Sequence, residues 1–443
     1  MLKRGGRKVI FFLTLTALFL AKAPPLEGYS VLSHEAVVDK AWDPVIKQLL
    51  LRLYPTASEA QLREAHAYAY GGCIIQDMGY YPFGNRFVSD LTHYVRSGGF
   101  VDALFEQAQN MYEFAFALGA LAHYTADNSG HPIAVNRSVP EIFPKLRVKY
   151  GKVVTYEDDP AAHLMVEFSF DVAQIAASNY TPETYHNFIG FKVAQAQLER
   201  AFQETYGVEF KKLFLSEDLA IGTFRRGASE VIPEMTRVAW KDKKSEILKS
   251  NPKMTRGVFV YKFSRREYRR DFGVNFTRSR FSREVWGGGS DAKPGLLARF
   301  LVFLTRVLPK VGPLRTLRFK APTPQTDSMF LASFETTSRH YRDTLGKVGW
   351  KPPLLPDTNL DTGSPTRAGD YGLADRTYAR LLDKLADQHF AGVTSDLKAN
   401  ILDFYQNPNA DVATKRNPKE WQKVEGEIES LRAAPETSAA GAK

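Results

Sequence analysis

The hydrophobic positions of the chain recur mostly at helical spacing. From about Tyr29 to Leu248, apolar residues return every three or four positions, which places them on one face of an α-helix. A clear example is the run Ala36, Val37, Trp42, Val45 and Ile46. No series of alternating polar and apolar residues indicates a sheet, and no internal repeat is visible. The pattern therefore predicts an all-α fold.

Two of the predicted helices are strongly apolar and also carry ionisable residues. Asn110 to Asp127 (NMYEFAFALGALAHYTAD) is expected to form one buried helix. The pair Asp159-Pro160 is expected to open another, because a capping carboxylate is followed by proline at the first helical position. Residues 80–86 (YYPFGNR) are predicted to form a loop, which Pro82 and Gly84 break from the flanking helices.

The N-terminus has the features of a secretory signal. Four basic residues within the first eight precede an apolar run from Val9 to Leu20. That run has 12 residues, whereas a helix that spans a bilayer needs about 20. Residues 1–28 are therefore predicted to be a signal peptide, and the mature protein to be secreted or periplasmic. Cleavage after Ala23 and cleavage after Gly28 both fit the sequence, and an uncleaved N-terminal anchor is the alternative.

The amino-acid composition of the chain changes after about residue 251. Lys253 to Glu284 holds ten Lys or Arg against three acidic residues, interleaved with aromatic residues. Leu296 to Leu308 is apolar but too short to span a bilayer, so it is either a packed helix or one on a membrane surface. Residues 321–368 are rich in Pro, Thr and Gly, while Ala374–Phe404 and Lys419–Leu431 read as amphipathic helices. The predicted parts are a signal peptide (1–28), a main helical domain (29–248), a basic and apolar extension (249–320), a helical C-terminal region (321–432) and a disordered tail (433–443).

Composition narrows the possible chemistry. The 443 residues carry a formal net charge of +10, which favours anionic partners such as lipid headgroups, nucleic acid or phosphate esters. The single cysteine, Cys73, excludes an intrachain disulfide and a cysteine-rich zinc ribbon. A metal site in this chain must therefore be built from histidines and carboxylates.

Histidines and carboxylates do occur together at helical spacing. Asp127 follows His123 by four positions, His131 follows Asp127 by four, and Glu167 follows His163 by four. Residues four apart share one face of a helix, with Cβ atoms about 5–6 Å apart. An imidazole and a carboxylate can then converge on one zinc ion at about 2.0–2.2 Å. These pairs are therefore candidate metal ligands.

Three further residues extend this group. Asp77 and His93 flank the loop 80–86, and His34 lies near the expected mature N-terminus. Taken singly, such residues are more often surface pairs or hydrogen-bonded core residues than ligands. The combination favours metal binding, because a carboxylate inside an apolar helix is costly unless it is paired or binds a metal. The remaining histidines lack such partners in the sequence and are assigned no site: His66, His186, His340 and His389.

At these positions the chain resembles the zinc-dependent phospholipase C family. That family is related to the fungal single-strand-specific nucleases and to glycosylphosphatidylinositol-specific phospholipase D. The motifs follow the order of the family: YSVLSH, QDMGYYPFGNRFVSDLTHY, AHYTADNSGHP and HLMVE. The resemblance covers about Tyr29–Asp171, extends at most to residue 248 and leaves out residues 252–443. It implies a multi-helix bundle of the zinc phospholipase C and nuclease type for residues 29–248, the catalytic domain, with an additional C-terminal helical extension.

The resemblance also implies a role for each candidate ligand and up to three zinc ions. The implied ligands are Asp77, His93, His123 and Asp127 for one ion, His131, His163 and Glu167 for a second, and His34, Asp127 and the α-amine and carbonyl of Tyr29 for a third. Ligation by the Tyr29 amine requires cleavage directly before that residue, where many family members begin with Trp. Asp77 is also the implied candidate for orienting or deprotonating the attacking water.

The implied function is a secreted, zinc-dependent phosphodiesterase of the phospholipase C type that acts on phospholipid headgroups, with membrane surfaces as partners. A zinc-bound hydroxide would attack phosphorus, and Tyr80, Tyr81 and Phe83 are candidate walls of the substrate pocket. One alternative is a single-strand nuclease or nucleotidase that uses the same ions and binds nucleic acid through residues 253–284. The other alternative is a non-catalytic helical protein that binds lipid surfaces.

Overall fold

The computed structural model describes residues 31–81, 83–177, 191–226, 240, 244–245, 247–248, 252–259, 320–349 and 354–435. These residues form helices and only two short strands, which confirms the all-α prediction. The predicted signal peptide, Tyr29, Leu296–Leu308 and most of the basic stretch lie outside the described residues. Among the helices of the described part, none combines the length and the apolarity that crossing a membrane requires.

The N-terminal half of the chain forms a bundle of helices around a large hydrophobic core. Its first elements are α2 (Val31–Ala41), a π-helical turn (Trp42–Ile46), α3 (Lys47–Leu53), α4 (Glu59–Gly72), a 3-10 turn (Ile75–Tyr80), α5 (Arg86–Tyr94), α6 (Ser97–Glu106) and α7 (Met111–Gly130). The next are a π-helical turn (His131–Val135), α8 (Asn136–Ile142), α9 (Pro144–Tyr150), α10 (Pro160–Ala177), α12 (Gln195–Tyr206), a 3-10 turn (Phe210–Leu213), α13 (Glu217–Arg226) and α15 (Arg256–Phe259).

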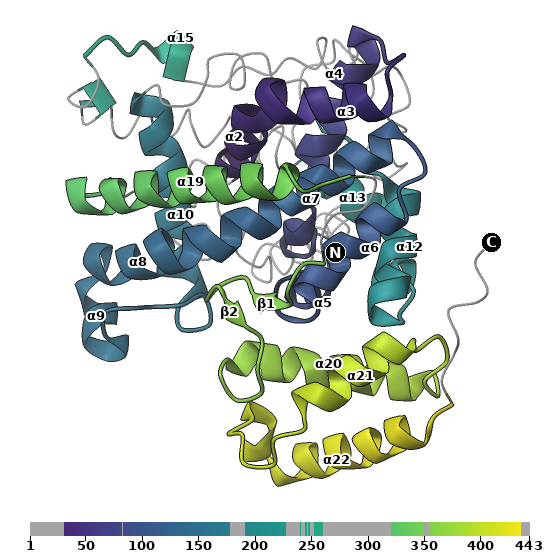
Figure 1. Cartoon of the computed structure of the whole chain (residues 1–443). Coiled ribbons are helices and arrows are strands. Elements are labelled where there is room, and N and C mark those ends of the chain that lie inside the picture. Colours follow the sequence, from purple (N-terminus) through teal and green to yellow (C-terminus); the bar gives the residue numbers. More distant parts are fainter. Residues whose placement is uncertain are drawn as a thin grey trace, which may run out of the picture.

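Helix α7 lies at the centre of the bundle (Figure 1). The side chain of Asn110 caps it by accepting hydrogen bonds from the N–H groups of Tyr112 and Glu113 at 3.0 and 3.1 Å. Most of its residues are buried, because the helix is apolar on nearly every side. The helix predicted over residues 110–127 is thereby confirmed, and it continues to Gly130.

Helices α4 and α7 cross with their backbones in contact. A methyl group at Gly119 would lie 2.0 Å from the carbonyl oxygen of Ala69, and one at Gly72 would lie 1.9 Å from that of Phe116. Only glycine permits such an approach at these two positions. The crossing places Cys73, at the end of α4, beside the middle of α7.

Helix α10 begins where the Asp159-Pro160 pair predicts. Oδ1 of Asp159 accepts a hydrogen bond from the N–H of Ala162 at 2.9 Å, and Pro160 is the first residue of the helix. The capping carboxylate and the proline therefore act as their sequence pattern indicates.

Helix α19 (Pro324–Leu345) lies within residues 321–368, the segment rich in Pro, Thr and Gly at the start of the predicted helical C-terminal region. The Thr and Pro residues at its start are not a loop but a cap, since Oγ1 of Thr323 accepts a hydrogen bond from the N–H of Thr326 at 3.2 Å. The hydroxyl of Tyr341 donates to the carbonyl oxygen of Leu118 in α7 at 2.8 Å. Helix α19 thus packs across α7 and α2, as Figure 1 shows.

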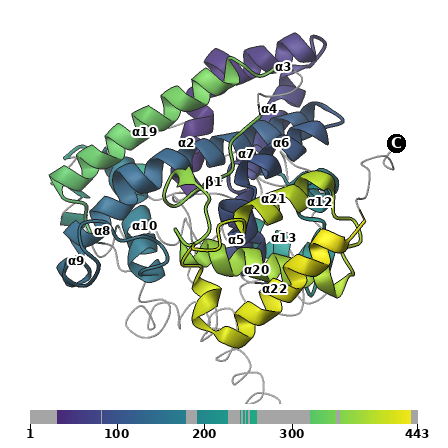
Figure 2. The same cartoon turned by 60° about the horizontal axis from the view of Figure 1, so that its bottom comes forward.

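The end of the chain forms a small lobe beside α5 (Figures 1 and 2). Its elements are β1 (Thr358–Asn359), β2 (Ser364–Pro365), α20 (Gly372–Asp387), α21 (Ser395–Phe404), a 3-10 turn (Ala413–Arg416) and α22 (Pro418–Ala433). The two strands are antiparallel, with Thr358 opposite Pro365. Inside the lobe the ring of Tyr378 stacks on that of Phe404 at a centroid distance of 3.7 Å.

Hydrogen bonds fasten the segment around β1 to three helices of the bundle. The hydroxyl of Tyr124 in α7 donates to the carbonyl oxygen of Pro356 at 2.7 Å. The hydroxyl of Ser97 in α6 donates to the carbonyl oxygen of Thr358 at 2.6 Å. The N–H of Leu360 donates to the carbonyl oxygen of His93 in α5 at 3.0 Å. The C-terminal region is therefore joined to the helices that carry the candidate metal ligands.

Candidate metal centre

The structure brings four of the predicted ligands together at one point. Nε2 of His93 lies 3.4 Å from Oδ1 of Asp77, 3.4 Å from Oδ2 of Asp127 and 3.3 Å from Nε2 of His123. Nε2 of His123 lies 3.1 Å from Oδ2 of Asp127. A tetrahedral zinc ion with bonds of about 2.0–2.2 Å places its ligand atoms about 3.3–3.6 Å apart. Each of these four distances is close to the spacing of two ligands of one zinc ion, and Asp77, His93 and His123 form one group that could hold an ion; these three residues and Asp127 are called the first site below.

The rings of the first site are oriented by backbone carbonyl groups. Nδ1 of His123 lies 3.0 Å from the carbonyl oxygen of Cys73, which the crossing of α4 and α7 puts there. Nδ1 of His93 lies 2.8 Å from the carbonyl oxygen of Ser89, one turn earlier in α5. In both rings this contact places the proton on Nδ1, so that Nε2 presents its lone pair to the other ligand atoms.

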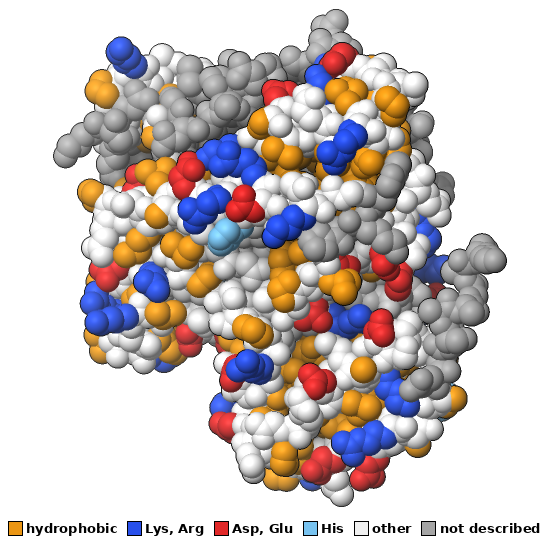
Figure 3. Space-filling model, in the orientation of Figure 1, with side chains coloured by type: hydrophobic (Ala, Val, Ile, Leu, Met, Phe, Trp, Pro, Cys, Tyr) orange, Lys and Arg blue, Asp and Glu red, His pale blue; other side chains and the backbone are white. Residues whose placement is uncertain are grey.

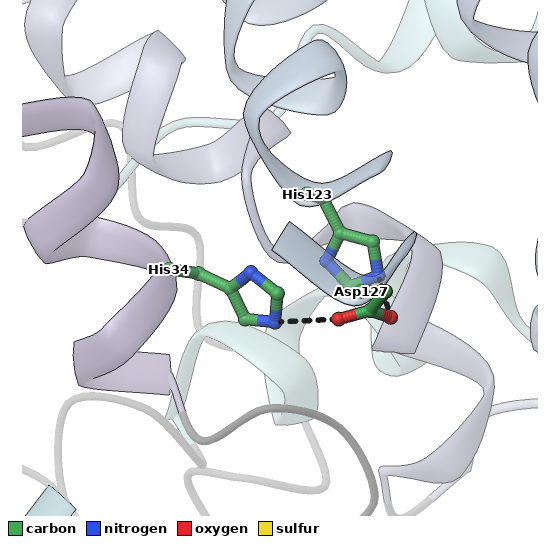
Figure 4. A group of neighbouring side chains, drawn as sticks. All are labelled: His34, His123 and Asp127. Carbon is green, nitrogen blue, oxygen red and sulfur yellow. Dashed lines mark ion pairs between the residues drawn. The ribbon is translucent and has the colours of Figure 1, made fainter. Parts of the chain in front are cut away.

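Asp127 lies between the first site and two further candidate ligands. Its Oδ2 faces the first site, while its Oδ1 lies 3.5 Å from Nε2 of His34 and 3.7 Å from Nε2 of His131. Figure 4 shows His34 reaching from α2 toward Asp127 and His123, and the rings of the two histidines stack at 4.3 Å. Asp127 is thus placed to bridge ions. The Tyr29 ligand of a third ion lies outside the described residues and stays a prediction.

The remaining predicted ligands form a second group next to Asp127, called the second site below. Oε1 of Glu167 lies 2.8 Å from Nδ1 of His163 and 3.4 Å from Nε2 of His131. His163 and Glu167 share one face of α10, whereas His131 directly follows α7. The structure therefore brings together all the predicted ligand side chains that it describes.

A further carboxylate, which the sequence analysis missed, faces the second site. Oδ1 of Asp361 lies 3.5 Å from Nδ1 of His131 and 3.3 Å from Nε2 of His163. Asp361 follows β1 in the C-terminal region, where a single aspartate in a turn has no periodic pattern and no neighbouring histidine. Nothing in the local sequence marks this residue.

The side chains fit a divalent metal ion by their burial and by their unsatisfied atoms. In the described part of the structure, both oxygens of Asp127, both oxygens of Glu167 and Oδ1 of Asp77 are buried without a well-formed hydrogen bond. Buried carboxylates are costly unless a cation or a donor compensates them. Three groups of side chains there have ligand atoms within 4.8 Å of one another: His34 with His123 and Asp127, Asp77 with His93 and His123, and His131 with His163 and Asp361. Imidazole with carboxylate is a donor set that zinc accepts.

The charges of the cluster depend strongly on one another. Burial alone would raise the pKa of Asp127, but the surrounding imidazoles, His123 above all, hold that pKa well below its usual value. Burial alone would lower the pKa of His163, but Glu167 and Asp361 raise it to about 10. Protons on such imidazoles must leave before the rings can bind a metal, so metal uptake releases protons.

The centre lies inside the protein. The side chains of His34, His123 and Asp127 have no exposed surface, and those of Asp77, His131 and Glu167 are at most 5% exposed. Figure 3 shows basic and acidic side chains interspersed over the face of the molecule that is drawn there. The charges of the buried ligands interact more strongly with one another than charges at the surface do, because little water lies between them.

The three aromatic residues predicted to wall a pocket are placed differently from one another. The ring of Tyr80 is buried and lies 5.9 Å from that of His93, so it borders the first site. Tyr81 packs edge-on against Phe224 in the hydrophobic core, at 4.9 Å, which does not support a pocket role for it. Phe83 is exposed at the surface.

One histidine outside the centre has a partner that the sequence did not reveal. Nε2 of His66 lies 2.8 Å from Oδ1 of Asp39, and its ring stacks on Trp42 at 3.7 Å. In the sequence His66 has no carboxylate at helical spacing, and its partner Asp39 comes from the neighbouring helix α2. The pair forms a separate cluster, apart from the metal ligands.

The fold and the ligand set define an all-α protein with candidate metal-binding groups. Residues 33–215 match the family described as zinc-dependent phospholipase C. The family implies phospholipase C-like activity and a phospholipid substrate. The match covers less than half of the chain and does not include Asp361. Neither a curated protein nor a solved structure matches the chain with significance.

Proposed function

We propose that the protein is a zinc-dependent phosphodiesterase that hydrolyses phospholipid headgroups in the manner of a phospholipase C. The observation that carries this proposal is that Nε2 of His93 lies 3.3–3.4 Å from ligand atoms of Asp77, His123 and Asp127. These residues come from three elements that are separate in sequence. The distances from Nε2 of His93 are close to those between ligands of one tetrahedral zinc ion, and all four residues lie within the segment that matches the family.

The chain supplies positioning, charge and a proton acceptor. When bound, zinc supplies positive charge that polarises a phosphodiester and lowers the pKa of an attacking water. Asp127 holds the two sites together through its two oxygens. Asp77, at the edge of the first site, is the carboxylate proposed to orient the water and to take its proton. Tyr80 lies beside His93, where its ring can exclude bulk water from the reacting groups.

We further propose that the protein acts outside the cytoplasm after removal of residues 1–28. The support is the order of basic residues followed by a 12-residue apolar run in the sequence. N-terminal sequencing of the exported protein tests this directly. A mature chain beginning at Tyr29 supports the proposed amine ligand, and one beginning at Pro24 contradicts it.

Product analysis is the decisive test of the activity. The purified, zinc-loaded protein is incubated with vesicles of mixed phosphatidylcholine, phosphatidylethanolamine and phosphatidylinositol, and the products are identified by mass spectrometry. The expected products are diacylglycerol and phosphorylated headgroups. Activity should disappear with a chelator and return with zinc, while His123→Ala serves as the inactive control.

Three other outcomes would each overturn the proposal in a different way. Phosphatidic acid as the product indicates cleavage on the other side of phosphorus. Hydrolysis of single-stranded DNA without hydrolysis of lipid indicates a nuclease. Less than one zinc ion per chain after dialysis indicates a non-catalytic protein that has kept the helical bundle.

A further inference from the structure

Asp361 is held in place by contacts that use only one of its two carboxylate oxygens. Its Oδ2 accepts hydrogen bonds from the N–H of Tyr156 at 2.9 Å and from the hydroxyl of Tyr371 at 2.7 Å. The side chain is buried, and in the described part of the structure Oδ1 accepts no well-formed hydrogen bond. A buried carboxylate oxygen without a donor is costly, so the second oxygen needs an explanation.

That second oxygen faces both histidines of the second site at once. Oδ1 lies 3.5 Å from Nδ1 of His131 and 3.3 Å from Nε2 of His163. These are not the ring nitrogens that face Glu167, which are Nε2 of His131 and Nδ1 of His163. Each ring therefore has one nitrogen on the side of Glu167 and the other on the side of Asp361.

A contact of Asn136 indicates which ring nitrogen of His163 carries the proton. Its Oδ1 lies at a hydrogen-bond distance of 2.8 Å from Nε2 of His163, so that nitrogen is the donor and Nδ1 is left with the lone pair toward Glu167. The amide group of Asn136 also donates to the backbone carbonyl oxygen of Asp361 at 2.7 Å. A histidine that binds a metal usually donates its other N–H to a carboxylate or a carbonyl.

We propose that Asp361 is the positioning residue of the second site: its Oδ1 accepts the N–H of His131 and shares with Oδ1 of Asn136 the single N–H of His163, so that both rings turn their lone pairs toward Glu167 and a metal ion. Asp361 lies outside the segment that matches the family. The C-terminal region of this chain therefore completes a metal site of the N-terminal domain. This inference rests on the zinc centre of the proposed function.

Docking of the C-terminal region and binding of the second ion should then be thermodynamically coupled. The turn that carries Asp361 lies close against the end of α7, because a methyl group at Gly363 would lie 2.6 Å from the carbonyl oxygen of Asn128. Gly363 also has a φ of +68°, which glycine adopts without strain. The backbone of this turn is thus positioned tightly enough to place one carboxylate oxygen.

The test measures zinc binding to the full-length protein by competition with a chromophoric chelator. Asp361→Ala should weaken one class of zinc site by about 10–100-fold, which is typical for loss of a residue that orients a ligand. At saturating zinc it should still bind as many ions as the wild type. Asp361→Asn, which keeps an acceptor oxygen, should recover part of the loss. Glu167→Ala should instead lose one ion even at saturating zinc.

Two controls separate this role from a merely structural one. Asp375 is another carboxylate of the C-terminal region, and its two oxygens accept hydrogen bonds from the N–H groups of Gly369 and Ala413. Asp375→Asn is expected to change stability but not zinc affinity. In zinc-loaded protein with ¹⁵N-labelled histidine, NMR spectra should show that Asp361→Ala alters the ring N–H signals of two histidines, whereas Asp375→Asn alters none.

Each remaining outcome decides against the inference. Unchanged zinc affinity and unchanged ring N–H signals in Asp361→Ala overturn it. Loss of a whole ion at saturating zinc in Asp361→Ala also overturns it, because Asp361 would then be a ligand rather than a positioning residue. A wild-type protein that holds no zinc contradicts the proposed function itself, so the two failures are distinguishable.

Discussion

The first site is built almost entirely within the segment that matches the family. Its two imidazoles, from His93 and His123, are oriented by backbone carbonyl groups of Ser89 and Cys73. Those carbonyl groups are fixed by helix α5 and by the crossing of α4 with α7. A site oriented in this way depends on the backbone of the bundle and on little else.

The second site depends on side chains, and one of them comes from far along the chain. His131 and His163 face Asn136 and Asp361 with the ring nitrogens that do not face Glu167. Asp361 reaches them only because the C-terminal region docks onto α5, α6 and α7. The imidazoles of the first site are thus oriented by backbone groups and those of the second site by side chains. Only the second site should therefore respond to the docking of the C-terminal region.

The largest effect is expected from Asp127→Ala, because this carboxylate belongs to both sites. We expect loss of more than one zinc ion per chain and loss of activity by more than about 1000-fold. When the free zinc concentration is 1000 times the dissociation constant, each bound ion adds about 4 kcal/mol to the free energy of unfolding. Because the variant loses these ions, its melting temperature should fall strongly. Metal analysis and calorimetry check this, and a variant that retains the full zinc content would refute the bridging role.

His123→Ala should affect zinc binding at the first site but not at the second. Removing this imidazole should abolish activity and release the ion of the first site, while the second site keeps an ion that still depends on Asp361. His66→Ala is the matched control, since His66 is a histidine of the same bundle that pairs with Asp39 outside the centre. It should lower stability without changing the zinc content. Equal zinc loss in the two variants would contradict the assignment of the first site.

Gly98→Ala should disturb the docking of the C-terminal region. A methyl group there would lie 2.4 Å from the carbonyl oxygen of Leu355 and 2.5 Å from that of Pro356. We expect a loss of about 1–3 kcal/mol in the free energy of unfolding and weaker zinc binding at the second site only. Gly99→Ala is the control, because its methyl group would meet nothing closer than 3.4 Å. It should be neutral or gain up to about 1 kcal/mol.

The smallest expected effect is a change of stability with pH at the contact between α6 and the segment before β1. Oδ2 of Asp102 accepts a hydrogen bond from the N–H of Leu355 at 3.0 Å. Burial, together with the nearby Asp357, raises the pKa of Asp102 to about 6. A carboxylate with a raised pKa in the folded state contributes stability that is present at low pH and is lost as the pH rises through about 6.

Asp102→Asn should therefore stabilise the protein much more at pH 8 than at pH 4, which is near the pKa of an aspartate in the unfolded chain. The expected gain is below about 1 kcal/mol, because the side chain is only half-buried and solvent screens its charge. Melting temperatures of the variant and the wild type at both pH values check the sign. A gain of the same size at both values would show that the ionisation of Asp102 is not the cause.

Much of the metal centre could be predicted from local patterns. The apolar period of α7 and the Asp159-Pro160 start of α10 indicated two buried helices, and both are present. The spacing of four between His123 and Asp127 placed two ligands on one helix face, because that geometry follows from the helix itself. The bounds of helix α19 could not be read from its Thr and Pro residues, because these serve equally well in loops and in helix caps.

Short-range periodicity was enough to predict the main helices of the bundle and the His and carboxylate pairs that share one helix face. Only the tertiary structure decided that the pairs meet around Asp127, that His66 has a partner in Asp39, and that Asp361 faces His131 and His163. Such contacts depend on close helix crossings and on the docking of a distant turn. These long-range contacts arise from packing between helices and turns that are far apart in the sequence, so no periodic pattern along the chain predicts them.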